Sequence, residues 1–204
     1  MRASVVGGIA LALSATAFAE EPGDDPDGII ARTRETSATY SLFSWNIITL
    51  PNLPVQEEWA AEFHKGNLHR VETPRDRIVA DCLVMTGTYL RLGTGKTTEG
   101  PAVARAACGI QANSQVLESR ITGSSTGRFG VTHSVLVRDP TNVRTYEVAA
   151  NGALVAATID DLESNRLLKS FAIELSPTAP EDIFTVESLS RSAVPVEFRT
   201  HSAK

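Results

Sequence analysis

Three of the four histidines are the residues best suited to metal chemistry. His64, His69 and His133 match the number of imidazoles that a catalytic zinc site uses, and such a site keeps its fourth position open. Glu72 or Asp81 could add a carboxylate. The spacing gives this interpretation little support, because His64 and His69 are five residues apart and the sequence has no H-E-x-x-H motif. We therefore expect no bound metal and no cofactor, and keep the three histidines as weak metal-ligand candidates.

Ser125 is the residue best suited to nucleophilic catalysis. It is the central serine of residues 123–127, GSSTG, which match the G-x-S-x-G motif of hydrolases. The Asp pair at 160–161 and then His201 follow in the order Ser, Asp, His. That motif works on a sharp turn from a strand to a helix, whereas the residues that follow have the pattern of a strand. An exported hydrolase that uses Ser125 or a histidine-bound metal is therefore the alternative hypothesis, with His133 as a second weak catalytic candidate.

Two observations argue against the binding of nucleotides and nucleic acids. Residues 95–97, Gly-Lys-Thr, resemble the end of a phosphate-binding loop, but Leu90 stands where that loop needs its first glycine. The chain has 24 Asp and Glu against 19 Lys and Arg, and its net charge is −5. A face that binds nucleic acid needs an excess of positive charge to release counterions. We therefore expect no nucleic-acid partner.

The densest polar stretch of the chain runs from residue 69 to residue 77. Arg70, Arg75 and Arg77 could form one wall of a site for an anionic ligand, because guanidinium groups bind carboxylate or phosphate through paired hydrogen bonds. Asp81 could be buried near them. The alternative is a solvated hairpin whose opposite charges pair across the turn and discourage the association of sheet edges.

Trp45, His133 and Tyr146 form a second group of candidate ligand-binding residues. An alternating pattern places His133 on the same strand face as several valines. Pockets combine apolar walls with a few polar groups, so we expect these three side chains to line a cavity if the domain encloses one. This grouping depends on strand register, because a shift by one residue turns a side chain to the opposite face.

The first 19 residues have the layout of a secretory signal peptide, with one basic residue, an apolar run and small residues at positions 17 and 19. The apolar run is shorter than the roughly 20 residues that a membrane-spanning helix needs. We therefore predict cleavage after Ala19, no transmembrane segment in the mature chain, and a soluble protein in the periplasm or outside the cell. In that oxidising environment Cys82 and Cys108 are expected to form a disulfide worth about 3 kcal/mol.

Hydrophobic periodicity and turn residues predict the elements that position these side chains. We expect a flexible acidic leader at residues 20–38, followed by a single β-rich domain at 39–200. Strands are predicted at 39–50, 68–73, 77–85 and 88–92, a four-stranded antiparallel meander at 114–159 with a type I′ turn at Asn151-Gly152, and closing strands at 182–188 and 194–199. Helices are predicted at 54–66 and 160–171, with a short helix at 101–110.

These elements predict a mainly β (α+β) fold, an antiparallel β-barrel or strongly curved sheet with two packed helices. None of the catalytic motifs has the sequence context that its chemistry requires. We therefore favour a protein without enzymatic activity that binds a small molecule or a partner protein of the cell envelope. A structural envelope protein without a ligand site is the remaining alternative.

Overall fold

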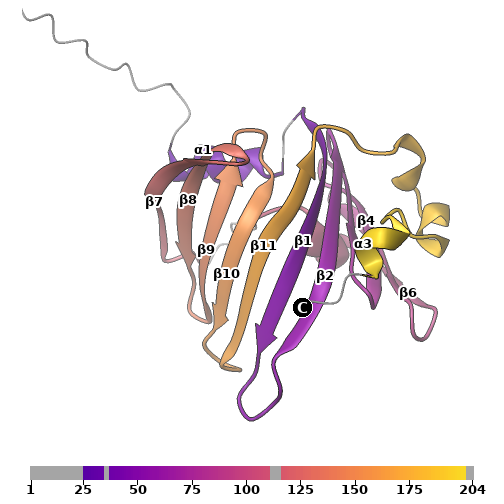
Figure 1. Cartoon of the computed structure of the whole chain (residues 1–204), viewed down its shortest axis with the longest axis horizontal. Helices are drawn as coiled ribbons and strands as arrows, with labels where there is room; N and C mark the ends of the chain where they lie inside the picture. Colours follow the sequence, from indigo (N-terminus) through magenta and orange to yellow (C-terminus); the bar gives the residue numbers. More distant parts are fainter. Residues whose placement is uncertain (1–24, 35–36, 111–115, 201–204) are drawn as a thin grey trace, which may run out of the picture.

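One curved antiparallel sheet makes up most of the protein. The computed structural model describes residues 25–34, 37–110 and 116–200. Its strands are β1 (Thr39–Thr49), β2 (Gln56–Lys65), β3 (Leu68–Glu72), β4 (Asp76–Asp81), β5 (Thr86–Arg91), β6 (Lys96–Glu99), β7 (Glu118–Gly127), β8 (Gly130–Arg138), β9 (Asn142–Ala149), β10 (Leu154–Asp161) and β11 (Arg166–Ser176). They are hydrogen-bonded in the order β6-β5-β4-β3-β2-β1-β11-β10-β9-β8-β7. The sheet bends strongly (Figure 1), and no ladder among the described residues joins the edge strands β6 and β7.

This architecture confirms the predicted fold class. The strands predicted at 39–50, 68–73, 77–85 and 88–92 correspond to β1, β3, β4 and β5, and the meander corresponds to β7 through β10. Helices α1 (Pro26–Arg32) and α2 (Pro101–Ala107) pack on the sheet, and α2 confirms the short helix predicted at 101–110. Both helices lie on the same face of the curved sheet.

The face that the helices cover is called the inner face. There, α1 packs Ile29 against Tyr146 of β9, and α2 packs Ala104 against Ala80 of β4. Gly87 of β5 permits the close approach of α2, because a Cβ atom at this position would lie 2.9 Å from the backbone nitrogen of Ala104. On the inner face, α2 is therefore held through small side chains and α1 through branched ones.

The opposite, outer face is covered by the C-terminal segment, residues 181–199, drawn in yellow in Figure 1. Successive side chains of a strand point to opposite faces, so Trp45 of β1 and Trp59 and Phe63 of β2 point outward together. They pack against Ile183 and its neighbours in the C-terminal segment. The sheet thus has an apolar core on each side.

Strand β2 replaces the helix predicted at residues 54–66. That prediction rested on Val55, Trp59 and Phe63, which recur every four residues. The same spacing fits a strand, because residues two or four apart share one of its faces. Along β2, Trp59 and Phe63 are buried and the strand pairs with β1 over its whole length, whereas Val55 is exposed.

Strand β11 replaces the helix predicted at residues 160–171. The residues that indicated a helix cap form a turn instead, in which the carboxylate of Asp161 accepts hydrogen bonds from the backbone N–H groups of Glu163 and Ser164. After this turn, β11 pairs with β1 on one side and with β10 on the other. Two ladders in the middle of the sheet outweigh the modest helix propensity of the segment.

The closing strands predicted at 182–188 and 194–199 are also wrong. These residues form two short 3-10 helices, η1 (Glu181–Ile183) and η2 (Glu187–Ser190), and the one-turn helix α3 (Val196–Arg199). Their apolar side chains pack onto the outer face, so they cover the sheet without adding to it.

Part of the predicted flexible leader at residues 20–38 is helical. Asp25 caps α1 by accepting a hydrogen bond from the backbone N–H of Gly28, and Ile29 and Ile30 are buried in the inner core. The acidic composition of this region led the sequence prediction to miss these two core residues. The predicted signal peptide lies outside the described residues, and the boundaries at 19 and 39 stay predictions.

The hairpin predicted at Asn151-Gly152 is present, but its turn is of another kind. A type I′ turn needs positive φ at both residues, whereas here only Gly152 has it, with φ of 87°. The N–H of Gly152 bonds to the carbonyl of Ala149 at 2.9 Å. Glycine is required because a Cβ atom would overlap the carbonyl oxygen of Arg32 at the end of α1.

Asp139 fixes the turn between β8 and β9. Its Oδ1 accepts hydrogen bonds from the backbone N–H groups of Thr141 and Asn142 at 2.9 and 2.8 Å, and its Oδ2 accepts one from Arg144 at 2.8 Å. Burial alone would raise the pKa of Asp139, but the hydrogen bonds from Thr141 and Asn142 outweigh it and hold the pKa below its usual value.

We expect Asp139→Asn to lower the free energy of unfolding by about 1.5 to 3 kcal/mol near neutral pH, the range for hydrogen bonds to a charged group. The folded-state pKa lies below the unfolded value of about 3.9, so this stabilisation is complete above that value and is lost as pH falls through the folded-state pKa. Urea unfolding of the variant and the unmodified protein over this pH range measures it. Asp160→Asn, at an exposed carboxylate of β10, is the control. The prediction would be contradicted if the difference in free energy of unfolding between the two proteins stayed constant as the pH falls.

Candidate functional site

A buried polar group lies on the inner face where β2 and β3 form a hairpin. The turn at Gly66, with φ of 60°, brings His64 and His69 directly opposite each other on the two strands. Both side chains point to the inner face, with ring centroids 3.9 Å apart, and both residues have no exposed surface. The sequence prediction found no shared face for these two histidines because it assigned the segment to a helix.

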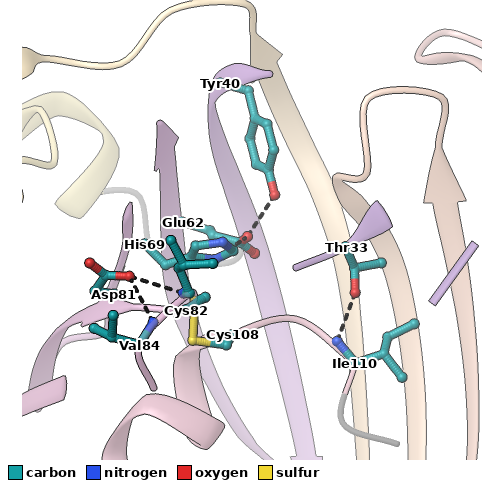
Figure 2. The surroundings of a disulfide bond; sticks show 10 residues. Thr33, Tyr40, Glu62, His69, Asp81, Cys82, Val84, Cys108 and Ile110 are labelled. Carbon is teal, nitrogen blue, oxygen red and sulfur yellow. Dashed lines mark hydrogen bonds and ion pairs between the residues drawn. A yellow bond between two sulfur atoms is a disulfide. The ribbon is translucent and has the colours of Figure 1, made fainter. Parts of the chain in front are cut away.

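Glu62 and Tyr40 complete this group, which we call the histidine cluster (Tyr40, Glu62, His64 and His69). Glu62 precedes His64 by two residues and so shares its strand face. The hydroxyl of Tyr40 donates to Oε1 of Glu62 at 2.7 Å, and its ring stacks on His64 with centroids 4.8 Å apart. Oε1 of Glu62 lies 3.9 Å from Nδ1 of His69 (Figure 2). One potential ligand atom from each of Glu62, His64 and His69 lies within 4.8 Å of the other two.

Burial determines the electrostatics of the histidine cluster. It lowers the pKa of His69 to about 3, with a further contribution from His64, against the opposing effect of the backbone of Arg34 and Ala107. His69 is therefore a neutral imidazole at physiological pH. Burial also raises the pKa of Glu62, although the hydrogen bond from Tyr40 opposes this. An imidazole that is already deprotonated can bind a metal without first losing a proton.

The disulfide between Cys82 and Cys108 lies beside the histidine cluster (Figure 2). It confirms the predicted pairing and connects the end of β4 to the end of α2. Thr33, after α1, receives a hydrogen bond from the backbone N–H of Ile110 at 3.0 Å, two residues beyond the disulfide. The segments that cover the cluster are therefore fixed to the sheet and to each other.

The other residues proposed as metal ligands lie elsewhere. His133 is on β8 opposite Val148, and it does not belong to the one three-residue group with ligand geometry among the described residues. Glu72 points to the outer face, where it binds Arg70. Asp81 accepts hydrogen bonds from the backbone N–H groups of residues 83 and 84 in the turn after β4. Of the three histidines, the fold brings together only His64 and His69.

Ser125 lies within strand β7, where its hydroxyl is 3.0 Å from Oγ1 of Thr132 on β8. The strand-to-helix turn that the G-x-S-x-G motif requires is replaced by a β-hairpin. His201, the base of that hypothesis, lies outside the described residues. The local structure at Ser125 is thus that of a hairpin tip.

Two of the three arginines predicted to bind an anion converge on a carboxylate of the chain itself, because Arg70 and Arg77 lie 2.7 and 3.4 Å from Glu72. Arg70 is fully buried on the outer face, and Arg77 donates to the carbonyl of Leu189 at 2.8 Å. Both hold the C-terminal segment against the sheet. Arg75 lies in the turn between β3 and β4 and pairs with Glu58 at 2.8 Å.

A groove of about 380 Å³ opens on the outer face between β1, β11 and α3. We call it the aromatic groove, and its lining residues are Phe43, Trp45, Ile173, Glu174, Pro195, Glu197 and Phe198. The rings of Phe43 and Phe198 lie 4.8 Å apart, and the indole N–H of Trp45 donates to Glu57 at 3.1 Å. Among the predicted ligand-binding residues, Trp45 lines the aromatic groove, and Asp81 and Arg75 line two other surface hollows. Tyr146 is packed in the inner core.

A β-bulge in β11 shapes this groove. Phe43 pairs with Glu174 and Ser44 pairs with Ala172, so Ile173 has no partner residue in β1. The bulge turns two consecutive side chains, Ile173 and Glu174, into the groove, and Arg128 donates to the carbonyls of Ala172 and Ile173. Sequence patterns do not reveal a bulge, so the prediction missed these two residues.

Glu62 and Tyr40 were also missed as site residues. Glu62-x-His64 is visible in the sequence once residues 56–65 are taken as a strand, because alternate residues share a face. Tyr40 could be assigned only with the register of β1 on β2.

Among the described residues, no helix has both the length and the apolar character needed to cross a membrane. The disulfide and the β-rich fold agree with the corresponding sequence predictions.

Comparison with solved structures supports the class of fold seen here, an open and curved antiparallel sheet. No protein-family model matches the chain, and no curated protein does. An uncharacterised conserved protein from Thermus thermophilus has a similar structure, with a TM-score of 0.53 and 14% identity over 85% of this chain and 96% of that one. At this identity the likeness concerns the fold alone.

Two further solved structures are less similar. A LolA superfamily protein from Nitrosomonas europaea has a TM-score of 0.46 and 8% identity over 81% of this chain and 99% of its own. MucB has a TM-score of 0.48 and 12% identity over 82% of this chain and 63% of its own.

Proposed function

We propose that this protein is an exported binding protein whose aromatic groove takes a small apolar or amphiphilic molecule. The observation that supports this most directly is the lining of the groove. Aromatic rings from β1 and α3 face a hollow of about 380 Å³, within the size range of small-molecule sites. Such sites are mostly apolar with a few polar groups, and here the polar groups are Glu174 and Glu197.

The residues around the groove favour an apolar ligand. Ile173 and Phe171 of β11 are 41% and 44% exposed, and Val196 of α3 is 61% exposed. Exposed apolar side chains that gather beside a groove are typical of a binding surface. The two glutamates favour a neutral or cationic ligand over an anionic one, because a carboxylate repels negative charge at short range.

Ile173→Glu is expected to weaken the binding of N-phenyl-1-naphthylamine, a neutral fluorescent probe, by at least about tenfold, or ~1.4 kcal/mol. The new carboxylate would place charge in the groove beside Glu174, where an apolar probe offers it no partner. Fluorescence titration measures the affinity, with energy transfer to the probe from the neighbouring Trp45 and Trp59 as a second signal.

Val131→Glu is the matched control, because Val131 is 46% exposed on β8 and does not line the groove. Circular dichroism establishes that both variants are folded. The proposal would be rejected if the unmodified protein did not bind the probe, or if both variants bound it equally well.

A further inference from the structure

We propose that Glu62, His64 and His69 form a binding site for one divalent transition-metal ion, with Zn²⁺ as the preferred ion. This site is on the inner face and does not depend on the function proposed for the aromatic groove. The three side chains come from the two strands of a single hairpin, and one ligand atom of each lies within 4.8 Å of the other two.

The types of donor atom determine the class of ion. Two imidazole nitrogens and one carboxylate oxygen form a common three-ligand set for zinc, which leaves a fourth position for water or another ligand. Hard ions such as Mg²⁺ and Ca²⁺ prefer a shell of oxygen atoms, which Glu62 and Tyr40 alone do not supply. The two cysteines of the chain are joined in the disulfide, so no thiolate competes for the ion.

The spacing is close to what a tetrahedral ion needs. Bonds of about 2.0 to 2.2 Å to nitrogen and oxygen place the ligand atoms of such an ion about 3.4 Å apart. Contraction from the present separations of up to 4.8 Å requires a shift of the order of 1 Å. Rotation about the side-chain bonds of Glu62 can provide this, because that side chain retains 17% exposure whereas both histidines are fully buried.

The surroundings of the cluster match those of known metal ligands. Metal-bound carboxylates and imidazoles are held by a second set of hydrogen bonds that fixes their orientation. The hydroxyl of Tyr40 already donates to Glu62, and the backbone of Arg34 and Ala107 lies beside His69. The exposed edge of Glu62 gives an ion a path to histidines that are otherwise fully buried.

The test is a calorimetric titration of Zn²⁺ into the chelator-treated protein with its disulfide intact. We expect one ion per chain. Loss of a residue that only orients a ligand costs about 10- to 100-fold in affinity, so loss of a ligand in His69→Gln or Glu62→Gln is expected to cost about 100-fold or more. His133→Gln, which removes an imidazole outside the cluster, is expected to leave the affinity unchanged.

Three results would overturn the proposal: no binding of Zn²⁺ by the unmodified protein, binding that persists within about threefold in both cluster variants, or an equal loss in His133→Gln. A second measurement uses only the unmodified protein, in case a cluster variant fails to fold. Zn²⁺ must shift the side-chain nitrogen resonances of His64 and His69 and leave those of His133 in place. A shift at His133 alone would refute the proposed site.

Discussion

Replacement of Glu72 by Ala is expected to lower the free energy of unfolding by about 3 to 5 kcal/mol, the cost of leaving a buried charge without its partner. Arg70 and Glu72 are both fully buried, and Nε of Arg70 donates to Oε1 of Glu72 at 2.7 Å. Burial lowers the pKa of Arg70, and the carboxylate of Glu72 opposes that shift. Without this carboxylate, the guanidinium group would remain buried with only backbone and hydroxyl partners.

The same variant is expected to release the C-terminal segment from the outer face. Arg70 donates to the carbonyl of Ile183 and to Ser188, both at 2.7 Å, while Glu72 accepts from Ser192 at 2.7 Å and from the N–H of Ala193 at 2.8 Å. The ion pair is therefore a buried polar attachment point of residues 181–199, beside their apolar packing and the bond from Arg77, and its loss should increase the exposure of that segment to proteases.

Denaturant unfolding and limited proteolysis of Glu72→Ala measure the two effects. Glu118→Ala breaks an exposed ion pair with Arg120 and serves as the control, with an expected change below about 1 kcal/mol. The double variant Arg70→Met with Glu72→Leu should recover part of the lost stability, because an apolar pair leaves no buried charge. Recovery is expected to be incomplete, since the carbonyl of Arg191 loses its donor and the carbonyl of Ile183 keeps only the hydroxyl of Ser188. A destabilisation of Glu72→Ala as small as that of the control would contradict this account.

Removal of the disulfide is expected to lower the free energy of unfolding by about 3 to 4 kcal/mol. The chain-entropy relation gives this value for a loop whose ends are 26 residues apart. The effect should be concentrated at α2, which packs on β4 and β5 through small residues and has Cys108 at its end. A helix of seven residues depends on such packing, because isolated short helices are marginal in water.

The variant Cys82→Ser with Cys108→Ser tests this prediction by urea unfolding and by hydrogen exchange of the amides in α2. Reductant should destabilise the unmodified protein by a similar amount and leave the double variant unchanged. Hydrogen exchange in the β8–β9 hairpin provides the internal comparison, because these strands lie near the opposite end of the strand order from β4 and β5, on which α2 packs. Equal stability of the oxidised protein and the double variant would show that the disulfide does not constrain the unfolded chain.

Local sequence was sufficient to predict the disulfide, the β-rich class and the antiparallel meander. Two cysteines in a chain with a predicted export signal leave one pairing, and runs of apolar and β-branched residues between short turns indicated the strands of the meander. These features depend on local composition or on a period of two, which a sequence displays directly. Trp45 lies beside a groove, whereas its predicted neighbours Tyr146 and His133 lie on the other face of the sheet.

Pairing between distant segments decided the two strands that were predicted as helices and the positions of both candidate sites. A spacing of four residues fits one face of a helix and one face of a strand, so β2 became a strand because β1 and β3 pair with it. The hairpin register then placed His64 opposite His69, and the bulge in β11 turned Ile173 into the groove. The register of β2 and β3 becomes readable only once residues 56–65 are assigned to a strand, and the bulge depends on the pairing of β1 with the distant β11, so neither follows from local periodicity.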